Sequence, residues 1–359
     1  MELQDILSSV QPADQEAGRK CRARWDVIAK PLRGLGLLED AIVRIAAASG
    51  TPSPKIDPRA VIIMCADNGV VEEGVTQTGQ EVTALVTENF SKGITSVCIM
   101  AKAANCRIMP VDIGVAQEIS GAGIYSKKIA YGTRNMVKQP AMTREEAEKA
   151  ILCGIDMVKE AVSQGIKLLA TGEMGIGNTT TSAAVACVLL NQPAIKMTGR
   201  GAGLDDAGLQ RKIQAIEKAI FLHHPDPKDP VDVLSKVGGL DLAGLCGVFL
   251  GGAVYHVPVL ADGFISVAAA LCAVRLCSAV RDYIIATHVS KEPAAKDLLS
   301  ALGLEPLITA NMHLGEGTGA VAAIPLLDMA LKVFYEMPTF QDIEMEAYKD
   351  LEQEGGQPQ

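Results

Sequence analysis

Short β-branched runs alternate with helical stretches through the central part of this chain, and this alternation restricts the fold more than any other feature. Each run ends in Gly, Asp or Asn, and a helical pattern follows. This order is typical of a parallel sheet whose strands are joined by crossover helices. The expected strands are residues 60–66, 107–111, 167–171, 257–260 and 283–286. The sequence therefore predicts an α/β fold with Rossmann-like connections.

Three helices are marked by their sequences. Thr143 and Glu146 have the spacing of a capping box, which predicts a helix to about residue 163. Asp205 and Asp206 open a second helix that extends to about residue 222. After Gly319 the apolar stretch AVAAIPLLDMALKVFY predicts a last long helix, and the polar tail behind it is expected to fray.

The first 50 or so residues differ in character from the rest of the chain. An apolar stripe with helical spacing is formed by Leu38, Ala41, Ile42 and Ile45. The Pro-rich segment TPSPKIDPR follows it and indicates a boundary. We therefore expect a small helical domain from residues 1–55 together with 330–359, and an α/β domain from 56–329 that carries the site.

Composition excludes several classes of protein. With 42 acidic and 33 basic side chains the net charge is −9, which excludes a basic nucleic-acid surface. The nine cysteines lack any CxxC pair and mostly lie among apolar residues, so reduced thiols in a cytoplasmic protein are expected. Two acids among the first five residues argue against a signal peptide. The longest uncharged run, 242–261, contains four glycines and predicts a buried helix followed by a strand, not a membrane span.

The loops that follow parallel strands converge at one edge of the sheet, so they are the first candidates for a site. Loop 172–181 combines three glycines, three threonines and a helix start, and its amides can cradle a phosphate. It lacks the Gly-Lys-Ser/Thr of a Walker A loop, and Thr180 stands where GxGxxG needs its last glycine. A nucleoside triphosphatase or dinucleotide enzyme is therefore disfavoured, and a plain strand–helix turn remains the alternative.

Two acids and one lysine are candidate functional residues. Glu173 lies inside loop 172–181, and Glu316 stands between two glycines. Such a carboxylate has little cover, so it is either solvated or faces a ligand whose binding raises its pKa and makes it a general base. Lys212 either reaches an anion or belongs to a solvated helix face. The five histidines and the cysteines show no metal-ligand spacing, so no catalytic metal is expected.

Five motifs in a fixed order make these loops specific. They are ADNGVVEEGVTQTGQEVT, GEMGIGNTTTSAA, GRGAGLDDAGLQRK, PVLADGFISVAAAL and LGEGTGA. Over nearly the whole chain they resemble the nicotinate-nucleotide:dimethylbenzimidazole phosphoribosyltransferase family, which activates the lower ligand of cobamides. The resemblance implies a parallel α/β domain, a helical domain built from both chain ends, and a dimer. It also implies two small-molecule substrates, nicotinate mononucleotide and an aromatic base, without a cofactor or metal.

The resemblance assigns roles to individual residues. Glu316 matches the general base, which takes the N–H proton of the incoming base as its other ring nitrogen attacks C1′. Glu173 matches a second carboxylate, which stabilises the cationic ribosyl group or the base. The remaining matches are the phosphate-binding residues Gly175, Gly201, Lys212 and Ser290 and the base-pocket residues Thr76, Ala84 and Leu314.

Four departures from the family pattern concern the substrates. The chain has Thr76 where Ser is common and Ala84 where Gln often contacts the base. It also has His313 in place of an Arg and Ala295 in place of a His, so one anion contact is expected to be rearranged. Loss of an amide at residue 84 predicts a larger and less polar base pocket, unless both base-pocket positions simply repack.

These departures leave alternatives open. One is the relative that attaches phenol or p-cresol through an O-glycosidic bond and works as a heterodimer of two homologous subunits. Another is a non-catalytic, nucleotide-binding partner subunit, against which the retained Glu316, Glu173 and Lys212 argue. An unrelated dehydrogenase is disfavoured because no dinucleotide fingerprint is present.

Overall fold

The computed structural model describes residues 2–348 and has six parallel strands in one sheet. The strands are β1 (Arg59–Ala66), β2 (Arg107–Gly114), β3 (Tyr125–Ser126), β4 (Leu168–Met174), β5 (Val259–Ala261) and β6 (Ile284–Ala286). The predicted α/β class and all five predicted strands are confirmed. The sequence missed β3, whose two residues are too few to show a periodic pattern.

The order of the strands in the sheet determines where a crevice for a ligand can form. The order is β3-β2-β1-β4-β5-β6, so the chain moves outward on one side of β1 and then returns to its other side with β4. A reversal of this kind leaves a crevice at the carboxyl ends of the two central strands. Those ends are Ala66 of β1 and Met174 of β4. Glu173, expected in a loop, is therefore the next-to-last residue of β4 and lies at this crevice, because the strand extends beyond its predicted end at residue 171.

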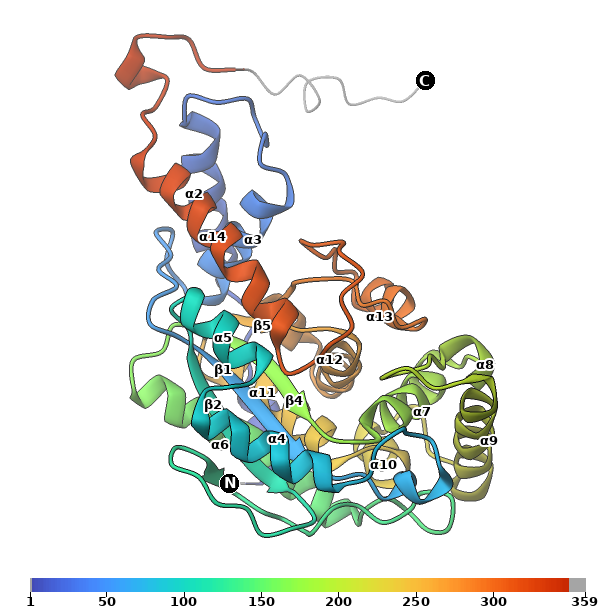
Figure 1. Cartoon of the computed structure of the whole chain (residues 1–359). Coiled ribbons are helices and arrows are strands. Elements are labelled where there is room, and N and C mark those ends of the chain that lie inside the picture. Colours follow the sequence, from blue (N-terminus) through green and yellow to red (C-terminus); the bar gives the residue numbers. More distant parts are fainter. Residues whose placement is uncertain (1, 349–359) are drawn as a thin grey trace, which may run out of the picture.

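Helices cover both faces of the sheet (Figure 1). Before β4 they are α1 (Leu3–Ser9), α2 (Gln15–Val27), α3 (Leu37–Ala48), α4 (Glu81–Lys92), α5 (Ser96–Ala103) and α6 (Arg144–Ser163). After β4 they are α7 (Asn178–Leu190), α8 (Ala194–Met197), α9 (Asp206–His223), α10 (Pro230–Val237), α11 (Leu240–Val254), α12 (Phe264–Leu276), α13 (Ala295–Leu302) and α14 (Thr318–Glu336). Short 3-10 turns within the described range are Gly69–Glu73, Ser278–Tyr283 and Gln341–Ile343.

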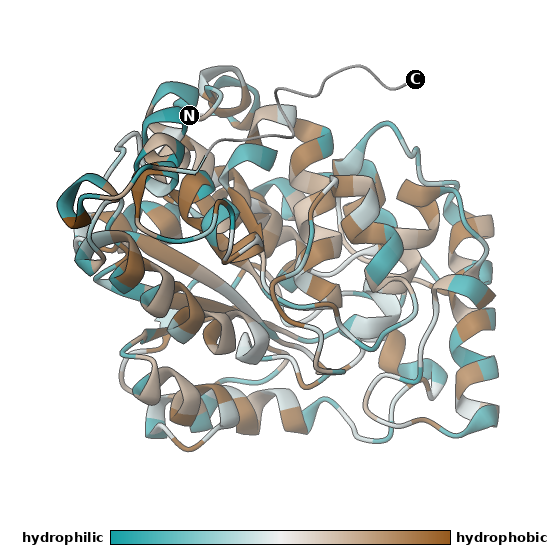
Figure 2. Ribbon diagram, turned by 90° about the horizontal axis from the view of Figure 1, so that it is seen from above, coloured by the Kyte–Doolittle hydropathy of each residue, from teal (hydrophilic) through white to brown (hydrophobic). Residues whose placement is uncertain are grey.

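Strand β1 is buried along its whole length and divides the core in two. Ile62 and Met64 belong to a cluster with α6, α7, α11 and α12, whereas Ile63 and Cys65 belong to a cluster with α3, α5 and α14. This alternation follows from the two-residue period of a strand. Figure 2 shows the hydrophobic residues concentrated in the central strands and the inner faces of the helices.

The predicted helix starts are confirmed by their capping contacts. Thr143 Oγ1 accepts the Glu146 N–H at 3.1 Å, and the Glu146 carboxylate accepts the Thr143 N–H at 2.6 Å, which is a complete capping box for α6. The Asp205 carboxylate accepts the Gly208 N–H at 2.7 Å at the start of α9. The uncharged run 242–261 forms the buried helix α11 and then β5, as expected.

Helices from the N-terminal and C-terminal parts of the chain pack together beside the sheet. Trp25 of α2 packs edge-on against Phe334 of α14 with ring centroids 5.1 Å apart, and Figure 1 shows α14 (red) running alongside α2 and α3 (blue). Because α14 is continuous from Thr318 to Glu336, the expected boundary at residue 330 falls inside it. The division into two domains stays a prediction, and the expected fraying of residues 349–359 lies outside the described residues.

Cysteines and apolar helices agree with a packed interior. All nine cysteines are free thiols, and eight of them are buried. Within the described range, one helix, α14, is long and apolar enough to cross a membrane by length and composition, and 56% of its apolar window is buried inside the fold. Burial of that kind is what a core helix shows.

Candidate active site

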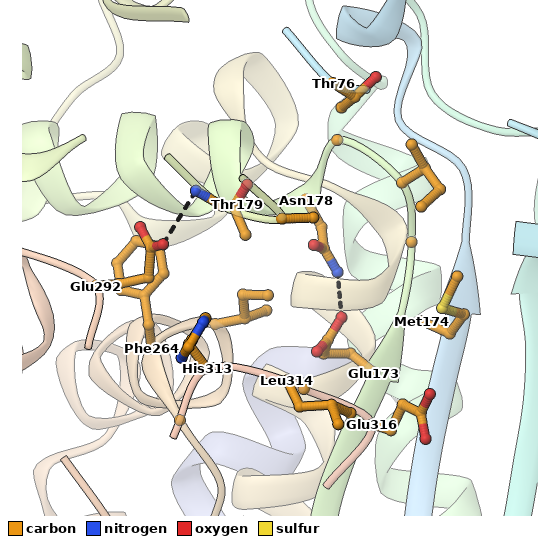
Figure 3. A pocket seen from close by; sticks show the side chains of 18 of the residues that line it. Thr76, Glu173, Met174, Asn178, Thr179, Phe264, Glu292, His313, Leu314 and Glu316 are labelled. Carbon is orange, nitrogen blue, oxygen red and sulfur yellow. Dashed lines mark hydrogen bonds between the residues drawn. The ribbon is translucent and has the colours of Figure 1, made fainter. Parts of the chain in front are cut away.

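A cavity of about 390 Å³ opens at the carboxyl edge of the sheet (Figure 3). The loops singled out in the sequence supply most of its wall, and seven predicted site residues line it: Thr76, Glu173, Gly175, Gly201, Ser290, Leu314 and Glu316. Figure 3 shows Glu173 and Glu316 near Leu314 on one side, with Thr179 and Glu292 on the other. Lys212 and Ala84 are not part of the lining.

Glu173 is held in a buried network of acids at the end of β4. Asn178 Nδ2, at the start of α7, donates to a carboxylate oxygen of Glu173 and at 3.0 Å to Asp241 Oδ2. Burial raises the pKa of Glu173 to about 8, and the nearby Asp241 and Asp262 add to the rise, while the hydrogen bond from Asn178 opposes it. Burial likewise raises the pKa of Asp241 to about 7. Glu173 therefore reaches the cavity with Asp262 nearby and Asp241 behind it, and a cationic ligand would stabilise its charged form.

Glu316 is presented by a backbone turn that depends on glycine. Gly315, Glu316 and Gly317 all have positive φ, at 91°, 61° and 94°, a region that side chains larger than hydrogen rarely adopt. A Cβ on Gly315 would lie 2.5 Å from Glu173 Oε1, so the missing side chain lets this loop cross directly over Glu173.

The carboxylate of Glu316 is anchored on a helix N-terminus. One oxygen accepts the Val97 N–H at 3.1 Å, in the first turn of α5. Partial burial raises the pKa of Glu316, while this hydrogen bond and the Thr95 side chain lower it. An anion at a helix N-terminus is favoured by the helix dipole, so Glu316 is fixed in place at the edge of the cavity.

A second cluster lies across the cavity: Gly201, Thr179 and Lys212, which we call the Gly201 cradle, with the Glu292 carboxylate seated against it. The Gly201 N–H donates to Glu292 Oε1 at 3.1 Å, and Lys212 Nζ donates to Thr179 Oγ1 at 2.8 Å. Lys212 is fully buried behind this wall, and burial lowers its pKa to about 8. A Cβ on Gly201 would lie 3.4 Å from Lys212 Nζ, so the lysine approaches the cavity from behind the glycine.

Gly175 and Ser290 border the same space. A Cβ on Gly175 would collide with the main chain of β1 and lie 2.6 Å from an Asp241 oxygen, so this position requires glycine. Ser290 Oγ accepts the Glu292 N–H at 3.3 Å. Both residues therefore present small groups to the cavity, Ser290 beside the Gly201 cradle and Gly175 next to the buried Asp241.

The side of the cavity formed by residues 75–86 and 314 mixes apolar with polar side chains: Val75, Val86 and Leu314 beside Thr76, Gln77 and Thr78. Thr76 Oγ1 donates to the Thr78 carbonyl at 2.8 Å, and Leu314 is 57% exposed. Helix α4 contributes Val86 to the lining, while Ala84 faces the core and is 8% exposed. Contact of Ala84 with a ligand stays a prediction.

The two departures expected to affect anion binding lie apart. His313 lines the cavity, and its Nδ1 is 2.9 Å from the Asn311 carbonyl oxygen. Ala295 is buried in the first turn of α13 and is not part of the lining.

Sequence reasoning missed several polar residues at this site. Asp262 and His288 both line the cavity and are nearly fully buried, with Asp262 Oδ1 3.9 Å from His288 Nδ1. Asp262 also accepts the Ala320 N–H at 2.9 Å, and burial raises its pKa. Both residues stand in strand-end loops, which was the available signal. Asp241 had another signal, because it is the one charged residue of the otherwise apolar helix α11.

No group of three or more His, Cys, Asp or Glu side chains among residues 2–348 is arranged to hold a metal ion. The polar groups that line the cavity include carboxylates, hydroxyls and main-chain amides. Chemistry at this site can therefore draw on proton transfer and on electrostatic stabilisation of charge by these groups.

Comparison with known proteins identifies the family. A sequence model described as Phosphoribosyltransferase matches residues 10–345. The nicotinate-nucleotide–dimethylbenzimidazole phosphoribosyltransferase of Clostridium acetobutylicum is 46% identical over 98% of this chain and 100% of its own length, and that of Acetivibrio thermocellus is 49% identical over 96% and 98%. The crystal structure of CobT from Thermus thermophilus superposes with a TM-score of 0.88 at 41% identity, covering 92% of this chain and 99% of that one. The chain thus belongs to the nicotinate-nucleotide–dimethylbenzimidazole phosphoribosyltransferase family, a family of pentosyltransferases.

Proposed function

We propose that this protein transfers the ribose 5-phosphate of nicotinate mononucleotide to 5,6-dimethylbenzimidazole or a similar base, giving the α-ribotide and nicotinate. The observation that carries the proposal is one cavity with two carboxylates, Glu173 and Glu316, on one side and the Gly201 cradle on the other. The phosphate needs the hydrogen-bond donors and the positive charge of the cradle. The reaction at C1′ needs the carboxylates, which can face the positive ribosyl group and the incoming base. The names of the relatives supply the identity of the substrates.

Glu316 is the general base in this proposal. The attacking ring nitrogen of the base forms a bond to C1′ while the bond from C1′ to the pyridinium nitrogen breaks, and that electron pair neutralises the departing nicotinate ring. The leaving group therefore needs no acid, but the other ring nitrogen of the incoming base must lose its proton. Glu316 is anchored on the Val97 N–H, which holds its carboxylate ready to take this proton. Attack from the face opposite the leaving group inverts C1′.

Glu173 stabilises positive charge in this proposal. The transition state for glycosyl transfer resembles an oxocarbenium ion, and the mononucleotide itself carries a pyridinium. A buried carboxyl group beside Asp241 and Asp262 resists ionisation without a ligand, whereas a cation within a few ångströms favours its charged form. Binding of the substrate therefore creates the negative charge that the transition state needs.

In this proposal the phosphate binds at the Gly201 cradle, with Ser290 beside it and the Gly175 main chain as a further contact. Lys212 supplies the positive charge from behind Gly201, and the N-terminus of α7 borders the same space. Main-chain amides at a helix start bind phosphate without a metal. No pyrophosphate leaves in this reaction, so the proposal requires neither Mg²⁺ nor a cofactor.

The substrates of a phosphoribosyltransferase are small molecules, and we propose a cytoplasmic enzyme that works as a dimer. The free thiols support a reducing compartment. Whether the second subunit is another copy or a homologous chain depends on which acceptor is used.

A second candidate is the phenol- or p-cresol-activating heterodimer. It is favoured by the apolar side chains of Val86 and Leu314 in the cavity wall, where the lining from α4 offers no amide side chain. A phenol has a single oxygen, so Glu316 would deprotonate the attacking atom itself. The negative charge of Glu316 serves either acceptor.

A competition assay tests both candidates. Purified protein, alone and with a homologous subunit where one exists, receives nicotinate mononucleotide with equal amounts of dimethylbenzimidazole and p-cresol, and the ribotides are separated by chromatography. We expect the benzimidazole ribotide from the protein alone. Turnover of dimethylbenzimidazole only, with or without a partner, eliminates the phenolic candidate, and absence of either ribotide together with no release of nicotinate contradicts the proposed function.

A further inference from the structure

The Gly201 cradle already holds an anion, and that anion is a side chain. Glu292 Oε1 accepts the Gly201 N–H at 3.1 Å, as the dashed line at Glu292 in Figure 3 shows. Glu292 Oε2 is buried and has no hydrogen-bond partner among residues 2–348. It lies so close to Gly199 that a Cβ there would collide with it. The carboxylate is therefore seated under loop 199–204 with one of its two oxygens unsatisfied.

The ammonium group of Lys212, behind this cradle, also makes fewer hydrogen bonds than it has donors. Lys212 is fully buried, and its ammonium has three donors but makes one hydrogen bond within the described part of the chain, to the neutral Thr179 hydroxyl. The negative charge of Glu292 raises the pKa of Lys212 and so partly offsets the lowering by burial. Arg200, which also lines this part of the cavity, is engaged with the Leu204 carbonyl and Asp206. Glu292 thus supplies the negative charge that a buried ammonium requires.

A phosphate bound in the cradle would need the Gly201 N–H, which now donates to the Glu292 carboxylate. An N–H directed at one acceptor cannot donate linearly to a second one. Two anions at this site also repel each other, because both would lie within hydrogen-bond distance of the same N–H. Phosphate binding and the present position of Glu292 therefore exclude one another.

We propose that Glu292 is a displaceable internal anion that occupies the phosphate cradle in the free protein, so that a ligand binds there only when its phosphate displaces this carboxylate. The inference rests on the proposed function and deepens it. Glu292 becomes a specificity-determining residue. A dianionic phosphate has more negative charge and one more acceptor oxygen than the carboxylate, so it binds Lys212 and the Gly201 N–H more strongly. A nucleoside without phosphate offers less and does not enter the cradle.

Substitution Glu292→Gln separates charge from shape. The amide oxygen can still accept the Gly201 N–H, but the negative charge is gone. We expect inorganic phosphate and ribose 5-phosphate to bind the variant about 3- to 30-fold more tightly by calorimetry, a range set by loss of one close charge pair in partly screened surroundings. The KM for nicotinate mononucleotide should fall in the same proportion. Glu305→Gln is the matched control, because it removes an exposed acid from a different cavity and is expected to change neither value.

The outcomes discriminate between the two proposals. Unchanged or weaker phosphate binding by Glu292→Gln, with normal binding by the wild type, overturns the role of Glu292 and leaves the proposed function intact. If neither protein binds inorganic phosphate or the mononucleotide, the phosphate assignment of the cradle fails and both proposals fall.

A second measurement does not depend on a folded variant. Wild-type crystals soaked in ribose 5-phosphate should show a phosphate oxygen on the Gly201 N–H and the Glu292 carboxylate turned away. A carboxylate that keeps the Gly201 N–H while phosphate binds in the cradle contradicts the inference. Glu292→Ala, which removes both the charge and the acceptor, should also strengthen phosphate binding if the inference is right.

Discussion

The two carboxylates of the cavity stand in opposite surroundings. Glu173 lies at the end of a rigid central strand, fully buried and tied through Asn178 to Asp241. Glu316 lies in a glycine loop, half-buried, with one oxygen on a helix N-terminus. Burial and neighbouring acids raise the pKa of Glu173 to about 8, whereas Glu316 has an amide and a helix dipole that oppose the effect of burial on its pKa.

This difference assigns separate tasks to the two acids. At neutral pH without ligand, most of Glu173 is protonated and cannot act as a base. The pKa of Glu316 is also raised by burial, but the Val97 N–H and the Thr95 side chain oppose that rise. Pairs of titratable groups whose environments move their pKa values apart indicate which one accepts a proton. The comparison therefore predicts that the two residues respond differently to substitution and to pH.

The largest effect is expected for Glu316→Gln, which removes the base but keeps the side-chain shape. We expect kcat to fall by about 10²- to 10⁴-fold, the usual contribution of a positioned general base. The KM for the mononucleotide should stay within about twofold, since the phosphate end is untouched. Base-dependent release of nicotinate, followed by chromatography, measures both, with Glu305→Gln as control. A Glu316→Ala protein that releases nicotinate at the wild-type rate would place the base elsewhere.

A smaller and pH-dependent effect is expected for Glu173→Gln. The amide resembles the protonated acid, so the variant should lose about 10- to 100-fold in kcat/KM, which corresponds to one electrostatic interaction in the transition state. Because raising pH through about 8 ionises Glu173 in the wild type, the deficit of the variant should grow as pH increases. A series of kcat/KM measurements from about pH 6 to about pH 9, centred near that pKa, gives the ratio of the two proteins. A ratio that is constant across this series would mean that the charge of Glu173 has no part in the reaction.

Asp241→Asn tests whether the acid network causes the difference. The amide oxygen can still accept from Asn178, but one negative charge beside Glu173 disappears. Less repulsion lowers the pKa of Glu173, so its inflection in the pH profile should move down by about one unit, with less than about a tenfold change in kcat. Asp241 is a positioning residue, since it is absent from the cavity wall. An inflection that does not move would show that burial and Asp262, without Asp241, set the pKa of Glu173.

Local sequence patterns were enough to predict five strands, two helix starts and the loops that form the cavity. Turn residues at strand ends and capping residues act within a few positions, and they located five strands and the starts of α6 and α9. Parallel strand order then brings their loops to one edge. Strand β3 has no such signal because two residues cannot show a period.

Contacts between distant elements could not be derived in this way. Asn178 and Asp241 are 63 positions apart, and their hydrogen bond depends on how α11 packs against the sheet. Lys212 was expected at an anion, but its burial behind Gly201 depends on the docking of α9 on α7. Ala84 and Val86 differ by two positions, which rotates the side chain about 200° around the helix. The helix phase, which residue types alone do not set, decides which of them faces the cavity.

The smallest expected effect concerns stability and follows from the same pKa difference. The folded pKa of Glu173 is about 8, above the ordinary value of 4.5 that applies to the unfolded chain, so the folded state holds a proton that the unfolded state releases as pH rises. The wild type therefore loses stability between about pH 4.5 and about pH 8, at no more than about 1.4 kcal/mol per pH unit. Glu173→Gln lacks this proton, and between about pH 6.5 and about pH 8 it should lose about 1–2 kcal/mol less in free energy of unfolding than the wild type, as measured by urea denaturation. Equal losses in both proteins would mean that Glu173 is already ionised in the free protein, and the contrast with Glu316 would then have to come from geometry alone.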